Sequence, residues 1–315
     1  MKAVILAAGY GKRLQPITNQ CPKVMIPIFG KPFITYLIDE IRRFGIEQIF
    51  LVTGYKREQI KKYFKDLSYN SELVFLHQKN REGTAHALDI CKKYIKNEKF
   101  LLFLGDTIIP DLTDYLERLT SVSAQNAILS AKITENLQDV GTLQIKNGNI
   151  KKILEKSRRP RSNIAWAGCG IFNYNIFDYI EKTETRLGEY SLTDTINIAI
   201  NEGVIFKNIF CKEFIDIGTH EGLYRALKYF FKYHNEEKCC SKLKIGKSVN
   251  EPCHIGKNCQ IGNNVSIGPY VSIEDGVTIN DDVSISNSLI LNDSIINKNE
   301  IISRAIIQKR WRVKI

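Results

Sequence analysis

The first 31 residues hold glycines and cations at a spacing that suits a polyphosphate ligand. An apolar run, Ala3–Ala8, leads into a turn with Gly9 and Gly11, and Arg13 and Lys23 follow. The run predicts a buried strand, and the glycines let backbone N–H groups approach an anion closely. Two cations beyond the turn would neutralise phosphate charge. The segment therefore predicts a phosphate-binding loop.

A glutamine and an aspartate each close an apolar run farther along the chain. Gln78 follows Glu72–His77, and Asp106 follows Leu101–Leu104 after one glycine. The amide of Gln78 both donates and accepts, which suits the edge of a pyrimidine base. A carboxylate at the carboxyl end of a parallel strand faces the ligand crevice, and its hard oxygens suit Mg²⁺. A glutamine in an ordinary loop, or an aspartate that caps a turn, would show the same local pattern.

Residues 6–23 resemble the signature of the sugar-phosphate nucleotidylyltransferases, L-A-[AG]-G-x-G-x-R-L-x-P-x-T-x-x-x-P-K. Lys12 departs from what is usual, because the family more often has a small hydroxyl residue there. The resemblance covers nearly the whole chain. It is nearest to archaeal-type UTP:sugar-1-phosphate uridylyltransferases that end in a left-handed β-helix. Some of those enzymes also carry acetyltransferase activity, but the short repeat of this chain argues against an acetyl-CoA site.

The resemblance implies which residues handle the nucleoside triphosphate. Arg13 and Lys23 are the expected catalytic residues: Arg13 holds the triphosphate, and Lys23 neutralises the α-phosphate and the incoming sugar phosphate. The block from Gln78 to Ala87 is similar to the base-reading loop of the family. The expected nucleotide-binding residues are Leu6, Ala7, Ala8, Gly9, Gly11, Lys12, Arg13, Gln78, Gly83, Thr84 and Gly105.

The same resemblance implies a sugar-phosphate site and a metal site. Glu155 would accept hydrogen bonds from sugar hydroxyls, and Lys156 would pair with the sugar phosphate. Asp216 lies in a block similar to the D-x-G-T motif of the family, and it is the expected partner of Asp106 in binding Mg²⁺. The expected sugar-phosphate residues are Lys23, Gly141, Glu155, Lys156 and Gly168.

Four other features have structural interpretations. Residues 188–194 match a further family block, G-E-x-x-[LI]-T-D, which we interpret as mainly structural. Trp166 stands where relatives that handle N-acetyl sugars often have asparagine, so it would stack on a pyranose or fill the core. His86 and His254 lack the spacing of metal ligands, and we interpret both as structural.

Short β-branched runs alternate with amphipathic stretches up to about residue 231, which predicts an α/β fold: a Rossmann-like domain with a mostly parallel sheet. The first strands are expected at Ala3–Ala8, Gln48–Thr53, Glu72–His77 and Phe100–Leu104. Later strands are expected at Ala127–Ile133, Thr142–Lys146, Ile150–Glu155, Ala167–Tyr174 and Val204–Cys211. Helices are expected at Pro32–Phe44, Lys56–Phe64, Gly83–Tyr94, Asp111–Thr120 and His220–Tyr233. Asn147-Gly148 is a tight-turn signal, so some of the later strands should be antiparallel.

The C-terminal part repeats with a period of six residues. Every sixth position from Cys253 to Ile307 is apolar, and a second apolar row starts at Ile255 and lapses at Asn297 and Ser303. This period predicts a parallel β-helix of roughly three coils, and the row resembles the hexapeptide repeats of left-handed β-helices. Glycines at 256, 262 and 268 would suit tight corners. The expected organisation is a catalytic domain at 1–233, a linker at 234–244 and a β-helix domain at 245–315.

Composition fits a globular protein of about two domains, with 315 residues, 43% apolar and 25% charged. No apolar run approaches the roughly 18 residues that span a bilayer. The eight cysteines include no C-x-x-C pair, so we expect free thiols in a reducing cytoplasm. The net charge of +11 is scattered along the chain, and it would attract phosphorylated substrates. We therefore expect neither a nucleic acid nor a membrane as partner.

The leading hypothesis is a nucleotidylyltransferase that joins an NTP to a hexose 1-phosphate and releases pyrophosphate. Ala7-Ala8-Gly9 and the block after Gln78 resemble the uridylyltransferases, so UTP with glucose 1-phosphate or N-acetylglucosamine 1-phosphate is favoured. Mannose-1-phosphate guanylyltransferase and glucose-1-phosphate thymidylyltransferase are the alternatives. A non-catalytic regulatory or scaffold paralogue is the alternative of another class. A homo-oligomer formed through the β-helix is also expected.

Overall fold

The computed structural model describes residues 1–65, 67, 72–121, 127–135, 137, 140–155, 162–186, 188–233 and 248–315. The chain divides into two compact units. The sheet unit holds Met1–Tyr10 and Leu37–Phe214, and the coil unit holds Gly11–Tyr36 and Ile215–Ile315. The predicted linker at 234–244 lies outside the described residues. The phosphate-binding signature is itself divided, because its strand belongs to the sheet unit and its cations belong to the coil unit.

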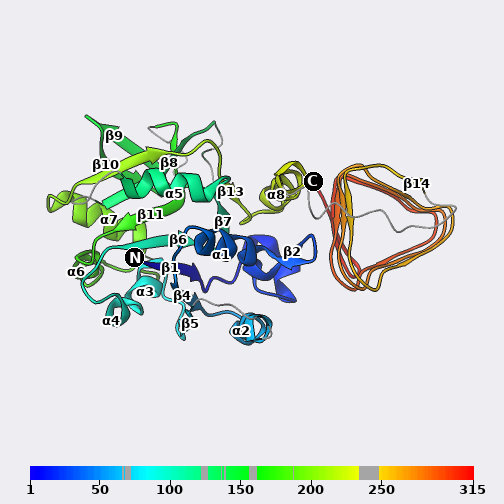
Figure 1. The fold of residues 1–315 in the computed structure, drawn as a ribbon, viewed down its shortest axis with the longest axis horizontal. Coiled ribbons are helices and arrows are strands. Elements are labelled where there is room, and N and C mark those ends of the chain that lie inside the picture. The colour runs from blue at the N-terminus through cyan, green and yellow to red at the C-terminus, as the bar shows by residue number, and fades with distance from the viewer. Residues whose placement is uncertain are drawn as a thin grey trace. The chain divides into compact units, whose positions relative to one another are not determined.

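The sheet unit is built on nine strands in the order β5-β4-β1-β6-β11-β8-β12-β10-β9 (Figure 1). Strands β5, β4, β1 and β6 are parallel to one another, as predicted, whereas β11 pairs antiparallel to β6. The other half is mixed, and Asn147 and Gly148, with φ of 52° and 70°, join β9 to an antiparallel β10. The strands are β1 (Lys2–Ala7), β4 (Gln48–Thr53), β5 (Glu72–His77), β6 (Phe100–Leu104), β8 (Ala127–Ile133), β9 (Thr142–Lys146), β10 (Asn149–Leu154), β11 (Ile164–Phe172) and β12 (Phe206–Phe210).

Most predicted helices form within two residues of their expected ends. The stretch predicted at Gly83–Tyr94 is wrong as one helix, because it breaks into α3 and α4. Helices α6 and α7 were not predicted, and with α3 and α4 they pack their apolar residues on one face of the sheet. The helices are α1 (Phe33–Arg43), α2 (Arg57–Lys65), α3 (Thr84–Asp89), α4 (Lys92–Ile95), α5 (Leu112–Ser121), α6 (Ile176–Ile180), α7 (Leu192–Asn201) and α8 (His220–Tyr233).

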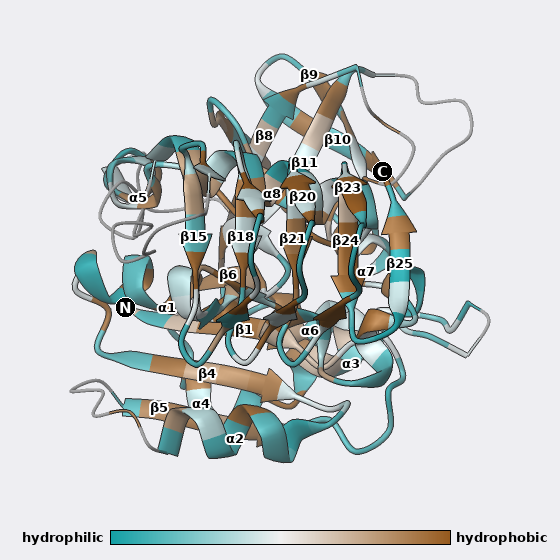
Figure 2. Cartoon of the chain, turned by 90° about the vertical axis from the view of Figure 1, so that its right-hand side faces the viewer, coloured by the Kyte–Doolittle hydropathy of each residue, from teal (hydrophilic) through white to brown (hydrophobic). Residues whose placement is uncertain are grey.

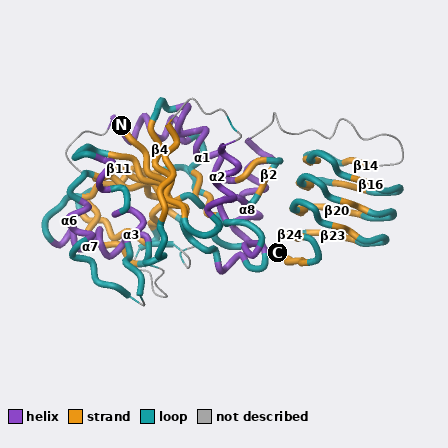
Figure 3. The backbone as a smooth tube through the Cα atoms, turned by 90° about the horizontal axis from the view of Figure 1, so that it is seen from below, coloured by secondary structure: helices purple, strands orange, loops and turns teal. Residues whose placement is uncertain are grey.

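The coil unit contains a parallel β-helix whose stacked coils are visible in Figure 3. One face is the row β15, β18, β21 and β24, closed by the antiparallel β25 (Figure 2). The strands of this face are β15 (Cys253–Ile255), β18 (Val271–Ile273), β21 (Ser288–Ile290), β24 (Ala305–Gln308) and β25 (Trp311–Lys314). The other two faces are β14 (Ser248–Val249), β17 (Ser266–Ile267), β20 (Ser284–Ser286) and β23 (Ile301–Ser303), and β16 (Gln260–Ile261), β19 (Thr278–Ile279) and β22 (Ile295–Ile296).

The sixfold apolar row fails as a prediction of burial in the last coil. Cys253 lies opposite Val271, eighteen residues later, but Val271 lies opposite Ser288, only seventeen residues later. The shorter coil moves the residues that follow it by one position, and a second step of seventeen residues, from Ile290 to Ile307, moves the end of the β-helix by one more. Ile295 and Ile301, expected in the core, are therefore 57% and 87% exposed. Their neighbours Ile296 and Ile302 take the core positions, whereas Ile307, the last residue of the row, is buried as expected.

The reason for the corner glycines also differs from the prediction. Only Gly268 has a left-handed φ, 106°, whereas Gly256 and Gly262 are needed for close stacking. A Cβ on Gly256 would lie 2.5 Å from Asp275 Oδ1 of the next coil. The left-handed corners are instead occupied mainly by asparagine and aspartate, which tolerate this conformation. They include Asn258, Asn264, Asp282, Asn287, Asp293 and Asn299.

Most of the described cysteines remain thiols, as expected: Cys21, Cys91, Cys169, Cys211 and Cys259. The expectation is wrong at Cys253, which is disulfide-bonded. The absence of a C-x-x-C pair does not exclude a disulfide between cysteines at another spacing. Among the helices that the structure describes, none is long and apolar enough to cross a membrane.

Candidate nucleotidyl-transfer site

The phosphate-binding signature continues from Gly11 as three short 3-10 turns in the coil unit. They are η1 (Lys12–Leu14), η2 (Ile17–Asn19) and η3 (Lys23–Met25). Gly11 has a φ of 73°, and a Cβ there would lie 3.0 Å from both Thr18 Cγ2 and Lys23 Cβ. The Thr18 hydroxyl donates to the Gly11 carbonyl over 3.0 Å. Glycine at this turn therefore brings the backbone of the loop against the half-buried Lys23.

Arg13 and Asp216 both approach Gly218 in the coil unit. A Cβ on Gly218 would lie 2.7 Å from Asp216 Oδ1 and 2.9 Å from Arg13 Nη2. The Gly218 N–H donates to the Asp216 carboxylate. Thr219 Oγ1 accepts from the Gly222 N–H over 3.0 Å at the start of α8, so the capping residue fixes where this block ends. The sequence did not predict that the guanidinium would lie beside the proposed metal ligand.

The residues predicted to read the base lie in the sheet unit, where Gln78 directly follows β5. Gln78 is 3% exposed, and its N–H donates to the Thr53 carbonyl over 2.9 Å. Its side-chain Nε2 donates to the Gly83 carbonyl over 2.8 Å and lies 3.5 Å from His86 Nδ1. His86, interpreted from sequence as structural, is thus a direct neighbour of the residue expected to read the base.

Gly83 is required by a very close backbone approach. Its φ is 102°, and a Cβ would lie 2.3 Å from the Tyr190 carbonyl oxygen. The Tyr190 N–H donates to the Glu82 carbonyl over 2.6 Å, and its carbonyl accepts from the Ala85 N–H over 3.0 Å. The Thr84 hydroxyl oxygen accepts from the Leu192 N–H over 2.9 Å. The base-reading loop is therefore held along its length by the segment 188–194.

The same segment also reaches the expected sugar side of the sheet unit. Thr193, 4% exposed, donates its hydroxyl to Glu155 Oε2 over 2.8 Å. A Cβ on Gly141 would lie 3.5 Å from that oxygen, and the Gly141 carbonyl accepts from the Trp166 N–H over 2.8 Å. Trp166 is 8% exposed, which agrees with a core-filling role. The segment 188–194 thus contacts both the loop predicted to read the base and the carboxylate predicted to bind the sugar, which agrees with a structural role.

The metal-binding prediction draws one carboxylate from each unit. Asp106 follows β6, where the Gly105 N–H donates to the Leu6 carbonyl over 2.9 Å, and Asp216 ends β13 (Ile215–Asp216). Within the described residues, no group of three or more His, Cys, Asp or Glu could hold a metal. Mg²⁺ shared between one or two carboxylates and substrate phosphates needs no such group. Each carboxylate is by itself a hard oxygen donor of the kind that Mg²⁺ prefers, and their sharing of one ion stays a prediction.

Of two further residues expected to bind the sugar phosphate, the structure describes Gly168 but not Lys156. Gly168 lies in β11 with a φ of 68°, and a Cβ there would lie 3.0 Å from Thr107 Oγ1. Glycine at this position therefore lets β11 approach the residue that follows Asp106. Lys156 lies outside the described residues.

A cationic aromatic cluster next to the glycine turn escaped the sequence analysis. The rings of Tyr10 and Tyr55 lie 4.2 Å apart, and the Arg81 guanidinium lies 5.7 Å and 5.9 Å from their centroids. The Tyr55 N–H donates to the Ala8 carbonyl over 3.2 Å. All three residues follow strand ends, but they are too far apart in sequence to form a motif.

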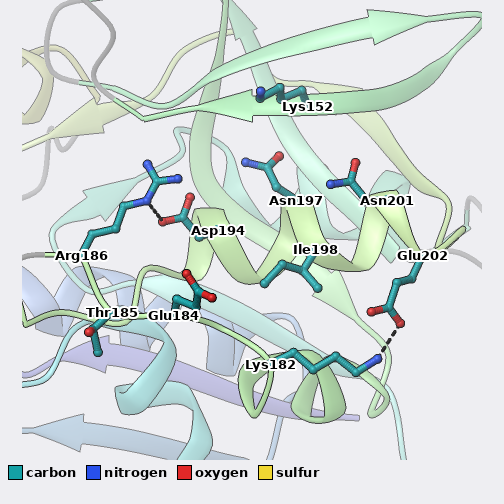
Figure 4. A pocket seen from close by; sticks show the side chains of 10 residues that line it. All are labelled: Lys152, Lys182, Glu184, Thr185, Arg186, Asp194, Asn197, Ile198, Asn201 and Glu202. Atoms are coloured by element: carbon teal, nitrogen blue, oxygen red, sulfur yellow. Dashed lines mark hydrogen bonds and ion pairs between the residues drawn. The ribbon is translucent and has the colours of Figure 1, made fainter.

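A cavity of about 570 Å³ lies elsewhere in the sheet unit, between α7, β10 and the chain before α7 (Figure 4). Ion pairs Arg186–Asp194 and Lys182–Glu202 stand at its two ends. Its lining residues are Lys152, Lys182, Glu184, Thr185, Arg186, Asp194, Asn197, Ile198, Asn201 and Glu202. None of them is a predicted site residue, so we do not assign this cavity to the reaction.

Comparison with known families is decisive at this point. The family model described as nucleotidyl transferase matches residues 2–232. The chain belongs to this family. A second model, described as the GMPPB C-terminal domain, matches residues 249–315. The sequence-based assignment of family and α/β nucleotidyltransferase fold is therefore confirmed.

Relatives within the family are sugar-1-phosphate nucleotidyltransferases. UTP–glucose-1-phosphate uridylyltransferase AglF of Haloferax volcanii is 33% identical over 64% of this chain and 85% of its own length. The bifunctional protein GlmU of Methanocaldococcus jannaschii is 36% identical over 75% of this chain, which spans only 56% of GlmU. A solved UDP-glucose pyrophosphorylase complexed with UDP-glucose is 26% identical, with a TM-score of 0.63, over 73% of this chain and 98% of that one.

Proposed function

We propose that this chain joins a nucleoside triphosphate to a hexose 1-phosphate. A phosphate oxygen of the sugar attacks the α-phosphorus in line, a P–O bond forms there, and the bond to the departing pyrophosphate breaks. The attacking oxygen is ionised at pH 7, so the step needs no general base. The protein must instead offset the repulsion between two polyanions and the charge that develops at phosphorus.

The observation that carries the proposal is the packing of the signature cations within one unit. Lys23 lies against Gly11, and Arg13 lies beside Asp216. Arg13 would hold the triphosphate, and Lys23 would neutralise the α-phosphate and the sugar phosphate. Asp106 and Asp216 would hold Mg²⁺, which when bound neutralises charge on the phosphate oxygens.

UTP is the nucleotide that we favour. The Gln78 side chain donates from Nε2 to the Gly83 carbonyl. No described residue donates to its Oε1. That oxygen would accept from the imide N–H of uracil. Guanine also carries a ring N–H, so mannose-1-phosphate guanylyltransferase is the second candidate, favoured by the shortness of the β-helix.

The sugar side of the proposal depends on Glu155. Its Oε2 accepts from Thr193 over 2.8 Å, and a carboxylate can accept several hydrogen bonds, sugar hydroxyls among their donors. We further propose a catalytic part at 1–233 and a β-helix domain at 245–315. The limits of the two family matches, 2–232 and 249–315, support this division.

A substrate matrix tests the proposed function. The purified chain would be offered each of four NTPs with glucose, N-acetylglucosamine or mannose 1-phosphate and Mg²⁺, and pyrophosphate release would be measured. We expect the highest rate with UTP and a gluco-configured sugar, and almost none after EDTA treatment or in Asp106→Asn. Absence of pyrophosphate from every pair, with a folded protein and active controls, would contradict the proposal and favour a non-catalytic paralogue.

A further inference from the structure

Glu274 is a charged residue in an unusual environment. Among the residues that the structure describes, it is the only Asp, Glu, Lys or Arg that is buried, with an exposed fraction of 0%. It follows Ile273 in β18, where preceding turns of the repeat have Gly256, Gly262 and Gly268. A buried carboxylate is costly unless hydrogen bonds compensate it. Its partners therefore indicate why this turn departs from the repeat.

Three donors converge on this carboxylate. The Ser272 hydroxyl donates to Oε1 over 2.6 Å. The backbone N–H of Phe29 donates to Oε1 over 3.0 Å, and that of Gly30 donates to Oε2 over 2.7 Å. Burial raises the pKa of Glu274, while the hydroxyl and the two amides oppose that rise. Both carboxylate oxygens are thus used, and two of the three donors belong to a segment some 245 residues earlier in the chain.

The two amides form the tip of a hairpin, β2 (Pro27–Ile28) and β3 (Lys31–Pro32). Phe29 and Gly30 have φ of 55° and 73°, so both tip residues are left-handed, a strained conformation for phenylalanine. The Phe29 ring also packs against His254, with 5.2 Å between ring centroids. The β-helix therefore contacts both the backbone and the side chain of this tip.

The hairpin is continuous with the turn that carries Lys23. The Ile26 N–H donates to the Lys23 carbonyl over 3.2 Å, and the Phe33 N–H donates to the Ile26 carbonyl over 3.1 Å. The Tyr36 hydroxyl donates to the Ile28 carbonyl over 2.7 Å. No more than five residues separate Lys23 from Ile28, so fixing the hairpin tip restricts where the backbone of Lys23 can lie.

We propose that Glu274 is a positioning residue: it anchors the 27–32 hairpin to the β-helix and so holds Lys23 in place for phosphoryl chemistry. The β-helix thereby takes part in the reaction without contacting a substrate. The kinetic part of this inference rests on the proposed function, whereas the anchoring part does not.

Amide exchange and kinetics together test the inference. Glu274→Ala and Glu274→Gln would be compared with Asp275→Asn, which alters the next residue. Asp275 Oδ1 accepts from the Lys257 N–H over 2.7 Å and so joins one coil to the next. Hydrogen–deuterium exchange of the Phe29 and Gly30 amides would be measured, together with kcat and both KM values.

We expect both Glu274 variants to speed exchange at these two amides and to lower kcat by about tenfold or more, the scale of a small misplacement of a catalytic group. KM for the NTP should stay within about twofold, because base contacts lie elsewhere. Asp275→Asn should leave exchange and kcat near wild type. If Glu274→Ala does not fold, Glu274→Gln is compared with Asp275→Asn instead, because glutamine keeps the side-chain shape of glutamate.

Unchanged exchange at Phe29 and Gly30 in a folded Glu274 variant would overturn the anchoring. Faster exchange with unchanged kcat would overturn the positioning role. A wild-type protein without transferase activity would instead contradict the proposed function, and the exchange data would still decide whether Glu274 anchors the hairpin.

Discussion

The phosphate segment, residues 11–36, and the loops for base and sugar are stabilised in different ways. The loops of the sheet unit are fixed by backbone hydrogen bonds to strands, such as Gly105 to Leu6 and Gln78 to Thr53. Before α1 begins at Phe33, the phosphate segment has only 3-10 turns and a two-stranded hairpin. Its anchors include side chains, Thr18 on Gly11 and Glu274 on the hairpin tip.

In the proposed function, this difference separates the residues that recognise the base and the sugar from the residues that neutralise phosphate charge. Backbone hydrogen bonds to the strands restrict the positions of the groups that would bind a base or a sugar. Cations on short turns depend instead on a few side-chain contacts. We therefore expect changes in the phosphate segment to lower kcat mainly, and changes in the sheet unit's loops to raise KM mainly.

Removal of a signature cation should have the largest effect. Arg13→Ala or Lys23→Ala should lower kcat by about a hundredfold or more, because each removes a contact to charge that develops in the transition state. Steady-state kinetics would measure this, with circular dichroism to verify folding. Arg43→Ala is the matched control, since Arg43 is an exposed partner of Glu40. A kcat near the wild-type value in Arg13→Ala would contradict a role of the phosphate segment in the reaction.

Two adjacent isoleucines test whether the β-helix that supports this segment has the register described here. Ile302→Ala removes a side chain that is 5% exposed and should cost about 2 kcal/mol or more of unfolding free energy. Ile301→Ala removes one that is 87% exposed and should cost less than about 0.5 kcal/mol. Denaturant unfolding would compare them. A larger loss of unfolding free energy in Ile301→Ala than in Ile302→Ala would instead support the sixfold register predicted from the sequence.

Gly83→Ala should disturb the base-reading loop, because the new Cβ would overlap the Tyr190 backbone and φ is 102°. We expect a stability loss of about 1–3 kcal/mol and a higher KM for the NTP. Gly203→Ala is the control, since its φ is 95° but nothing lies within 4 Å of the Cβ position. Equal effects in both variants would mean that the contact with Tyr190 is unimportant.

Thr193→Val should have the smallest effect. It removes one hydrogen bond to Glu155, a loss of about 0.5–1.5 kcal/mol, and should raise KM for the sugar phosphate severalfold with little change for the NTP. Thr183→Val removes a buried hydroxyl that bonds Tyr179 and Thr195 and should affect stability alone. Equal KM values in the two variants would argue against a positioning role for Thr193.

Much of the fold could be predicted from local patterns. The bounds predicted for β4, β5 and β6 agree with the structure, because each is a β-branched or aromatic run between polar turns. The sixfold row predicted the β-helix but not the loss of one residue before Ser288. A deletion of that size leaves isoleucine at both candidate positions in the last coil, so hydrophobicity alone cannot choose between them.

The candidate site was predictable where a motif is contiguous. Gly11, Arg13 and Lys23 share one segment, and their grouping follows from short turns. Glu274 and Thr193 bond to residues that are distant in sequence, and no local sequence pattern predicts such contacts. Glu274 visibly departs from the repeat, which has glycine at the equivalent earlier positions. Only the fold shows that its carboxylate accepts hydrogen bonds from the 27–32 hairpin.

The central claim is that the phosphate segment brings an NTP and a sugar 1-phosphate into direct reaction. Phosphorus NMR of the chain with UTP, glucose 1-phosphate and Mg²⁺ tests it most directly. The account predicts free pyrophosphate and two mutually coupled resonances from a diphosphate that links nucleoside and sugar. Formation of UDP and inorganic phosphate, or unchanged spectra with a folded protein across all the NTP and sugar pairs, would contradict it.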